Sequence, residues 1–245
     1  MANTFIDLCN QTLRRLNEIE IASAEFNNVR GVQALVKDSV RSAIKRINQA
    51  EYEWPFNAAE HTETLIVGQS EYSWPVALKV VEWPSFQIQE NDTFGVGFRS
   101  LDFIKREQWY DQHRNADNAA GPTGRDVPRF VFPSHGSGFG VTPTPDRAYT
   151  LKFRYWLNTV DLSRADDETR VPEDFDHVVV DGALYYMYMY KDNPESAQLT
   201  YEAFERGIKD LQSVFINDFA YVYDRRVAFG GGRSRSGGIL PFRSN

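Results

Sequence analysis

Four segments of the sequence place apolar residues three and four positions apart, the spacing that aligns side chains on one face of a helix. In the first segment the shared face holds Phe5, Leu8, Cys9, Leu13 and Leu16. In the fourth segment it holds Ala197, Tyr201, Phe204, Ile208, Leu211 and Phe215. The pattern predicts helices over residues 4–17, 28–52, 172–191 and 193–215.

Residues at the ends of these segments agree with the boundaries. Thr4 is a good N-cap for the first helix, and the sequence Trp54-Pro55-Phe56 ends the second. Pro172 suits the first turn of the third helix, because a backbone N–H in that turn has no acceptor within the helix, so proline loses nothing by lacking one. The short turn at 192–194 predicts that the third and fourth helices form an antiparallel hairpin.

The middle of the chain follows a different pattern. Apolar and polar residues alternate from Tyr149 to Leu157, which predicts a strand with one buried face. Prolines divide the rest into short pieces, so we expect short strands joined by loops. Shorter strand candidates are residues 62–67, 78–88 and 129–132, and residues 101–113 are a candidate short helix.

These patterns predict an α+β protein, with a helical bundle made from the N- and C-terminal helices and a β-rich insertion between them. The expected helical domain combines residues 1–58 and 170–224, and the β-rich domain covers 59–169. Residues 225–245 are rich in Gly, Ser and Arg, a composition typical of a flexible arm.

Composition and charge exclude several classes of protein. The chain has 245 residues, 42% of them hydrophobic, so it is long enough to bury a core. One cysteine excludes a disulfide framework, and no apolar run reaches the length of a membrane span. We therefore expect a soluble protein made in a reducing cytoplasm. The net charge of −7 argues against a nucleic-acid binder along the whole chain.

The charge is unevenly distributed. Residues 225–245 contain five of the 27 basic residues and none of the 34 acidic ones, so the remainder of the chain is strongly acidic. Three readings stay open for this basic segment: a frayed terminus, an arm that binds a protein, or a direct contact with DNA phosphates.

No combination of residue types in the sequence indicates catalysis, a cofactor or a metal. His113 near Glu107 and Asp111 is the nearest approach to a metal cluster, and a polar helix end explains it equally well. The glycines of the sequence His-Gly-Ser-Gly-Phe-Gly (135–140) are followed by Val-Thr-Pro, which cannot begin a helix around a phosphate. We expect a hairpin turn there. The protein is therefore not expected to be an enzyme.

Three other features have structural interpretations. Cys9 lies on the apolar face of the first helix, where a buried, inert thiol is expected. The acidic run 166–168 is interpreted as a solvated loop before a helix. A cluster of aromatic residues makes the third helix apolar nearly all round, which is typical of a helix buried in a large core or packed between subunits. Its expected inter-subunit residues are Tyr185, Tyr186, Tyr188 and Tyr190.

Several motifs occur in an order that resembles one family. They are the segment 34–57, a long helix with a Trp-x-Phe-Asn exit, the sequence Gly-Gln-Ser-Glu-Tyr (68–72) before Trp74-Pro75, Pro-Arg-Phe (128–130), Pro-Thr-Pro-Asp-Arg-Ala-Tyr (143–149), and Val-Pro-Glu-Asp-Phe (171–175). In this order they resemble the head-to-tail adaptor proteins of tailed bacteriophages, most of all the tail tubular protein A group of short-tailed phages. The resemblance covers roughly residues 4–220.

The resemblance implies a structural protein of the virion neck, made in the host cytoplasm. Its helical domain would form a ring of twelve copies beneath the portal protein. The ring would extend the DNA channel, with DNA only as passing cargo and no membrane contact, and would offer a platform to the tail nozzle or tail tube protein. A stopper or tail-terminator subunit is the alternative.

The resemblance also implies a portal-docking role for the C-terminal segment. Its expected docking residues are Arg225, Arg226, Phe229, Arg233, Arg235, Ile239, Leu240, Phe242 and Arg243.

Overall fold

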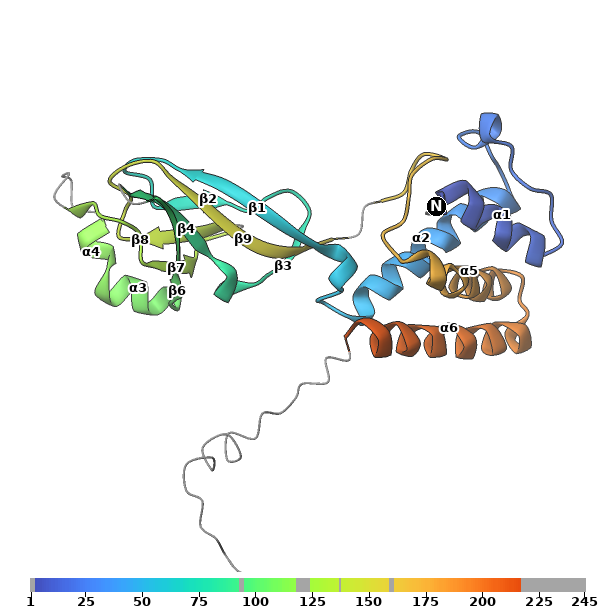
Figure 1. The fold of residues 1–245 in the computed structure, drawn as a ribbon. Coiled ribbons are helices and arrows are strands. Elements are labelled where there is room, and N and C mark those ends of the chain that lie inside the picture. Colours follow the sequence, from blue (N-terminus) through green and yellow to red (C-terminus); the bar gives the residue numbers. More distant parts are fainter. Residues whose placement is uncertain (1–2, 93–94, 118–123, 137, 159–160, 217–245) are drawn as a thin grey trace, which may run out of the picture.

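The computed structural model describes residues 3–92, 95–117, 124–136, 138–158 and 161–216, and it places helices and strands in two separate regions (Figure 1). We call these regions the helical part and the β part. The helical part consists of α1 (Phe5–Arg15), α2 (Val32–Ala50), α5 (Asp176–Tyr190) and α6 (Pro194–Phe215). The predicted α+β class is confirmed.

Helix α1 begins where the sequence predicts. The Thr4 backbone N–H donates to the Asp7 carboxylate at 3.1 Å, which completes a capping box at the helix start. The predicted apolar face is buried at Phe5, Leu8 and Cys9. The helix ends at Arg15, because Asn17 has a φ of +56° and continues the chain outside helical geometry.

Helix α2 begins four residues later than predicted. Gly31 has a φ of +60°, a conformation that suits glycine and starts the helix at Val32. The helix ends at Ala50, two residues before the predicted end, and the indole N–H of the buried Trp54 donates to the Ile47 carbonyl at 2.9 Å. A 3₁₀ turn, η2 (Pro55–Asn57), then leads into the β part.

Helices α5 and α6 form the predicted antiparallel pair. A short 3₁₀ turn, η5 (Glu173–Phe175), follows Pro172, so α5 itself begins at Asp176. The Asn193 side chain caps α6 by accepting from the Ser196 N–H at 3.2 Å. Gly182 and Gly207 let the two helices come close, since a Cβ at either position would lie 2.6 Å from a side chain of the other helix.

The four helices share one apolar core. Residues of α1, α2, α5 and α6 contribute to it, and α5 packs against each of the other three. Most of the predicted α6 seam is buried, at Ala197, Phe204, Ile208 and Leu211. Tyr201 is the exception: it is 40% exposed, so its predicted place in the buried seam is wrong.

The β part contains two sheets among the described residues. One has the order β1-β9-β4-β5, with β3 also paired to β9, and the other has the order β2-β8-β7-β6. All strand pairs are antiparallel except β6 with β7. The strands are β1 (Ala58–Leu65), β2 (Glu71–Ser73), β3 (Leu78–Val81), β4 (Gln87–Asp92), β5 (Gly95–Ser100), β6 (Asp102–Phe103), β7 (Phe130–Pro133), β8 (Gly138–Thr142) and β9 (Tyr149–Leu157).

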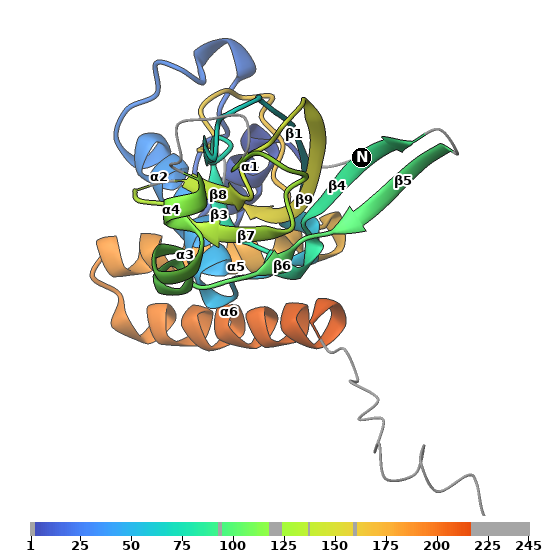
Figure 2. The ribbon, with the colours of Figure 1, turned by 90° about the vertical axis from the view of Figure 1, so that its left-hand side faces the viewer.

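Strand β9 confirms the predicted alternation. Tyr149, Leu151, Phe153 and Tyr155 are buried, while the residues between them are more exposed. It is the central strand of its sheet, hydrogen-bonded to β1, β3 and β4. The β4–β5 hairpin extends away from the rest of the β part (Figure 2).

Other predictions for the middle of the chain needed correction. The candidate strand 78–88 is three elements, β3, the 3₁₀ turn η3 (Trp83–Ser85) and β4, because Pro84 cannot continue a strand ladder. The candidate helix 101–113 contains β6 first, and its helix α3 covers only Arg106–Gln112. A further short helix, α4 (Arg114–Asp117), follows. Strand β1 begins at Ala58, four residues before the predicted start.

Aromatic rings fill the core of the β part. Phe86 stacks on Phe153 with ring centroids 4.5 Å apart, and Phe139 lies 5.4 Å from Phe153 and 5.0 Å from Trp74. Phe86 immediately precedes β4, Phe153 lies on β9, Phe139 lies on β8, and Trp74 lies in the loop after β2. They join the two sheets into one packed unit.

Lys79 connects the two parts at their junction. Its ammonium group donates to the Asn48 carbonyl and, at 2.7 Å, to the Glu51 carbonyl, both at the C-terminal end of α2. These carbonyls have no partner inside the helix, and a cation favours that end of the helix dipole. Burial lowers the pKa of Lys79, opposed by the nearby charge of Glu51.

Candidate assembly surfaces

The tyrosine cluster predicted between subunits lies on α5, but its members have different surroundings. Tyr186 and Tyr188 are partly buried against the core of the helical part. Tyr185 contacts the rings of Tyr186 and Tyr201, at centroid distances of 5.0 and 5.1 Å. Tyr190, the last residue of α5, is 64% exposed. The cluster is therefore partly core and partly surface.

A partly exposed aromatic patch forms where α5 meets α6. Tyr185 and Tyr201 provide it, and the pKa of Tyr186 beside them is raised, chiefly by burial. The exposure of Tyr201 was not predicted from the sequence, because every apolar residue at helical spacing was assigned to the shared face of its helix. The exposure of Leu199 and Val214 on α6, 66% and 61%, was not predicted either.

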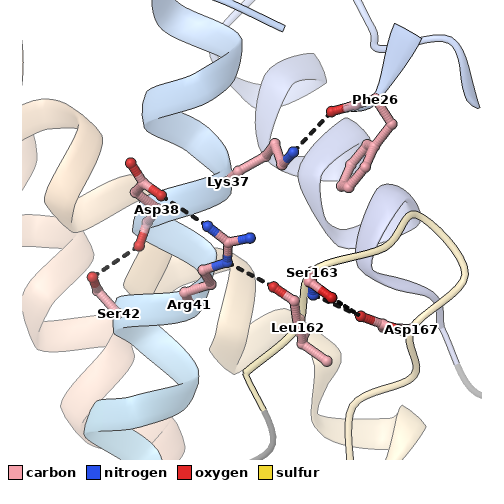
Figure 3. Close-up of polar contacts among 8 residues, drawn as sticks. All are labelled: Phe26, Lys37, Asp38, Arg41, Ser42, Leu162, Ser163 and Asp167. Carbon is pink, nitrogen blue, oxygen red and sulfur yellow. Dashed lines mark hydrogen bonds and ion pairs between the residues drawn. The ribbon is translucent and has the colours of Figure 1, made fainter. Parts of the chain in front are cut away.

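The loop that returns from the β part to α5 is fixed to α2 by a polar contact (Figure 3). The Arg41 Nε donates to the Leu162 carbonyl at 2.7 Å, and its Nη1 lies 3.1 Å from the Asp38 carboxylate. Nearby, the Lys37 ammonium donates to the Phe26 carbonyl at 2.8 Å and lies 4.0 Å from the ring centroid of Phe26. Arg41 and Lys37 of α2 therefore hydrogen-bond to the backbone of neighbouring loops.

The acidic run 166–168 has a structural role within this loop. The Asp167 carboxylate accepts from the N–H group of Ser163 at 2.6 Å (Figure 3). It also accepts from the N–H group of Arg164 at 2.7 Å. These bonds lower its pKa, because they favour the charged form. The Asp167 carbonyl accepts from the Phe5 N–H at 2.8 Å, which ties the loop to α1. The carboxylate holds the turn, so it is not poised for acid–base chemistry.

A cavity of about 230 Å³ lies between this loop and α2. Its lining includes Asn48 and Asn57, whose amides bond to each other at 2.5 Å, and Thr169. The lining mixes apolar, amide and charged side chains, among them Asp167, Glu168 and Arg170. The Asp167 carboxylate is held by N–H groups of the loop itself, so we interpret the cavity as a gap beside the returning loop.

Cys9, the glycine-rich turn 135–140 and His113 were the other residues considered for chemistry, and each lies where it serves the fold. Cys9 is buried, and burial raises the pKa of its thiol to about 12, so the reactive thiolate is scarce. Gly136, with a φ of +81°, turns the chain between β7 and β8, which confirms the hairpin expected there. The ring of His113 lies 5.3 Å from that of Phe130, and the described residues contain no group of three potential metal ligands.

The predicted docking segment at the C-terminus, Arg225–Asn245, lies outside the described residues. The last described residues of the chain lie beside the start of the β part, where Phe215 contacts Phe56 with ring centroids 5.9 Å apart.

The comparisons with known proteins identify the family. Residues 3–228, nearly the whole chain, match the model of the SU10 adaptor protein family. None of the curated proteins compared with the sequence matches it. In the parts that the structure describes, no helix is both long enough and apolar enough to cross a membrane.

The family match agrees with the order of motifs in the sequence. The resemblance to phage head-to-tail adaptors, found over roughly residues 4–220, is confirmed over nearly the same range. The narrower likeness to the tail tubular protein A group stays a prediction. The family consists of structural phage proteins. The chain belongs to the SU10 adaptor protein family of phage head-to-tail adaptors.

Proposed function

We propose that this protein is a structural adaptor in the neck of a tailed phage, where it joins the portal protein to the tail. The family match over residues 3–228 carries this proposal. The elongated arrangement supports it, because the helical part and the β part lie at opposite ends and offer two separate surfaces (Figure 1). A protein that connects two partners requires such surfaces.

In this proposal, residues 1–58 and 170–224 are a helical bundle that forms a ring of twelve copies beneath the portal, and the β-rich insertion 59–169 points toward the tail nozzle or tail tube. The common core of the four helices supports a single helical unit. A ring requires head-to-tail contacts between two different faces of each subunit. The partly exposed Tyr185 and Tyr201 and the exposed Tyr190 suit one such face.

The basic segment 225–245 would then be the arm that grips the portal. Its arginines and its apolar residues Phe229, Ile239, Leu240 and Phe242 combine charge with groups that fill pockets. The acidic remainder of the chain suits a channel through which DNA passes without being held, since like charges repel.

The solution mass of the purified chain, alone and mixed with the portal ring from the same genome, tests the proposal. We expect a monomer of 28.2 kDa that joins the portal in about twelve copies. A chain truncated after Asp224 should keep its fold and lose portal binding. Failure of the full chain to associate at any salt concentration would contradict the proposal and favour a stopper or tail-terminator subunit.

A surface variant tests the ring contact separately. Tyr190→Glu places a charge on an exposed position, so it should leave the fold intact and reduce the number of copies on the portal. The matched control is Val76→Glu in the β part, where the side chain is 93% exposed. Equal copy numbers for both variants and the original chain would remove Tyr190 from the interface.

A further inference from the structure

A pair of arginines is held together at the end of the β part farthest from the helical part, on α3 and α4 (Figure 1). Arg106, Tyr110 and Arg114 follow one another at intervals of four residues. The guanidinium carbons of Arg106 and Arg114 lie 5.3 and 5.0 Å from the centroid of the Tyr110 ring. Both cations therefore contact the same aromatic side chain.

The surroundings of Tyr110 hold this arrangement in place. Its hydroxyl lies 3.0 Å from Nε2 of His135, which belongs to the β7–β8 turn. The neighbouring residue Trp109 is buried and stacks on Phe132 with ring centroids 4.5 Å apart. The Trp109 indole N–H donates to Asp117 at 2.7 Å. A packed scaffold thus presents the two guanidinium groups at the surface.

The positive charge of this pair is not balanced by the described part of the chain. Within it, neither Arg106 nor Arg114 has a carboxylate at ion-pair distance, and the buried Nε of Arg106 has no hydrogen-bond partner. Glu107 and Asp111, on the same helix, form no ion pair with either arginine. The Asp117 carboxylate is occupied by the Trp109 indole and the Thr144 N–H.

Two like charges beside the same ring repel each other, and a buried donor without a partner costs free energy. An anion at the guanidinium groups would offset the repulsion between them. Such an unbalanced pair stands out in a chain whose acidic residues outnumber its basic ones, 34 to 27.

We propose that Arg106 and Arg114, positioned by Tyr110 and His135, form a docking site for the acidic side chains of a partner protein. A guanidinium group binds a carboxylate through two parallel hydrogen bonds. Arg, Tyr and Trp are also the residues that dominate protein interfaces. The acidic remainder of the chain disfavours a long phosphate backbone, whereas a short acidic segment needs only this local site. The identification of the partner as a tail component rests on the proposed function.

The first experiment uses the full chain labelled with ¹⁵N and a synthetic hexaglutamate peptide as the probe. We expect saturable shifts of the NMR signals of Arg106, Tyr110, Arg114 and His135, weakening as salt is added. The double variant R106Q/R114Q should bind at least about tenfold more weakly, a loss of about 1.4 kcal/mol. The matched control R225Q/R226Q removes the same charge from the C-terminal segment and should keep these shifts.

Three outcomes would overturn the proposal. The peptide could leave the signals of these four residues unmoved, or the R106Q/R114Q variant could bind as well as the original chain. A twelve-base-pair DNA duplex could also compete successfully for the site at equal charge concentration, which would make it a nucleic-acid contact. The Trp109 signals of the variant, compared with those of the original chain, verify that α3 still packs on Phe132.

A second experiment separates this proposal from the adaptor function. The R106Q/R114Q variant should join the portal ring like the original chain and lose binding to the tail protein of the same genome. If the original chain fails to join the portal but still binds hexaglutamate at Arg106 and Arg114, the adaptor proposal fails and the docking site stands. If tail binding is unchanged in the variant, the site does not attach the tail.

Discussion

The helical part and the β part bury their cores by different means. In the helical part, aliphatic side chains interlock and two glycines, Gly182 and Gly207, bring α5 and α6 together. In the β part, aromatic rings from several strands and loops stack against one another. The helical part also buries polar groups, among them Asp176, whereas the buried polar residues of the described β part are threonines.

This difference shows what each core depends on. Close helix contacts depend on the absence of side-chain atoms at a few positions, so an added methyl group is harmful there. A ring core depends on large side chains that fill space between sheets, so a lost ring leaves a cavity. Variants that remove a ring from one core or add a methyl group to the other therefore test the contrast.

Phe153→Ala should cause the largest loss. Phe153 is fully buried on the central strand β9, and its ring contacts those of Phe86 and Phe139. Removing a buried phenylalanine ring should lower the free energy of unfolding by about 3–5 kcal/mol, measured by urea denaturation. Phe98→Ala is the control, because Phe98 is 55% exposed on the same sheet. A loss below about 1 kcal/mol for Phe153→Ala would refute the ring-core description.

Gly182→Ala tests the helical part by adding atoms. The new Cβ would lie 2.6 Å from the Phe204 ring and 2.8 Å from Ala43, so α2 and α6 would have to move. We expect a loss of about 1–3 kcal/mol in the free energy of unfolding, although alanine favours helix by up to about 1 kcal/mol. Gly97→Ala makes the same change with nothing within 4 Å of the new methyl group. Equal stability of the two variants would contradict the close approach.

The same contrast explains how much of the fold the sequence could predict. Contacts of a helix recur every three or four residues, so the four long helices and most of their buried faces were correct. The ring core joins Trp74, Phe86, Phe139 and Phe153, which are far apart in the sequence and follow no local period. Strand β9, long and alternating, and β7 were predicted closely, and the candidates 62–67 and 78–88 overlapped β1, β3 and β4. Strands β2, β5, β6 and β8 were missed.

The candidate surfaces were harder to predict than the helices. Tyr185 and Tyr190, predicted to pack between subunits, are partly buried and 64% exposed, respectively, and their role between subunits stays a prediction. The ring of Tyr201, which contacts Tyr185, comes from a different helix, and the apolar face of a helix does not specify how that helix is rotated against its neighbour. The Arg106–Tyr110–Arg114 spacing was present in the sequence. Its meaning depended on the absence of a nearby carboxylate in the described residues, which only the three-dimensional arrangement reveals.

Lys79→Met tests the junction between the two parts. Methionine keeps the apolar stem and removes the ammonium group that donates to the Asn48 and Glu51 carbonyls. We expect a loss of about 1–2 kcal/mol in the free energy of unfolding, measured by urea denaturation. Lys45→Met, at an exposed position on α2, is the control and should change the stability by less than about 0.5 kcal/mol. If the two variants are equally stable, Lys79 contributes nothing to the junction.

The smallest effect concerns pH and is expected from the helical part. Burial raises the pKa of Asp176 above its ordinary value of 3.8, opposed by the hydrogen bond from Asn3, so the folded protein holds this proton more tightly than the unfolded chain. The stability that Asp176 contributes therefore falls as the pH rises from 3.8 through the folded pKa. Asp176→Asn should gain stability relative to the original chain over that range, measured as urea midpoints between about pH 4 and 7.

Asp167→Asn should change the pH dependence of stability in the opposite direction, measured by the same urea midpoints. The pKa of Asp167 is lowered by backbone N–H groups, so its contribution is present above the ordinary pKa and is lost as the pH falls through the folded value. The Asn variant should therefore be less stable than the original chain at neutral pH, and the difference should shrink in acid. Parallel pH profiles for the two variants would mean that at least one of the two carboxylates does not titrate as its surroundings require. Profiles of opposite slope would assign the pH dependence of stability to the polar contacts of Asp176 and Asp167 in the helical part. Among the described residues of the β part, no Asp, Glu or His is buried.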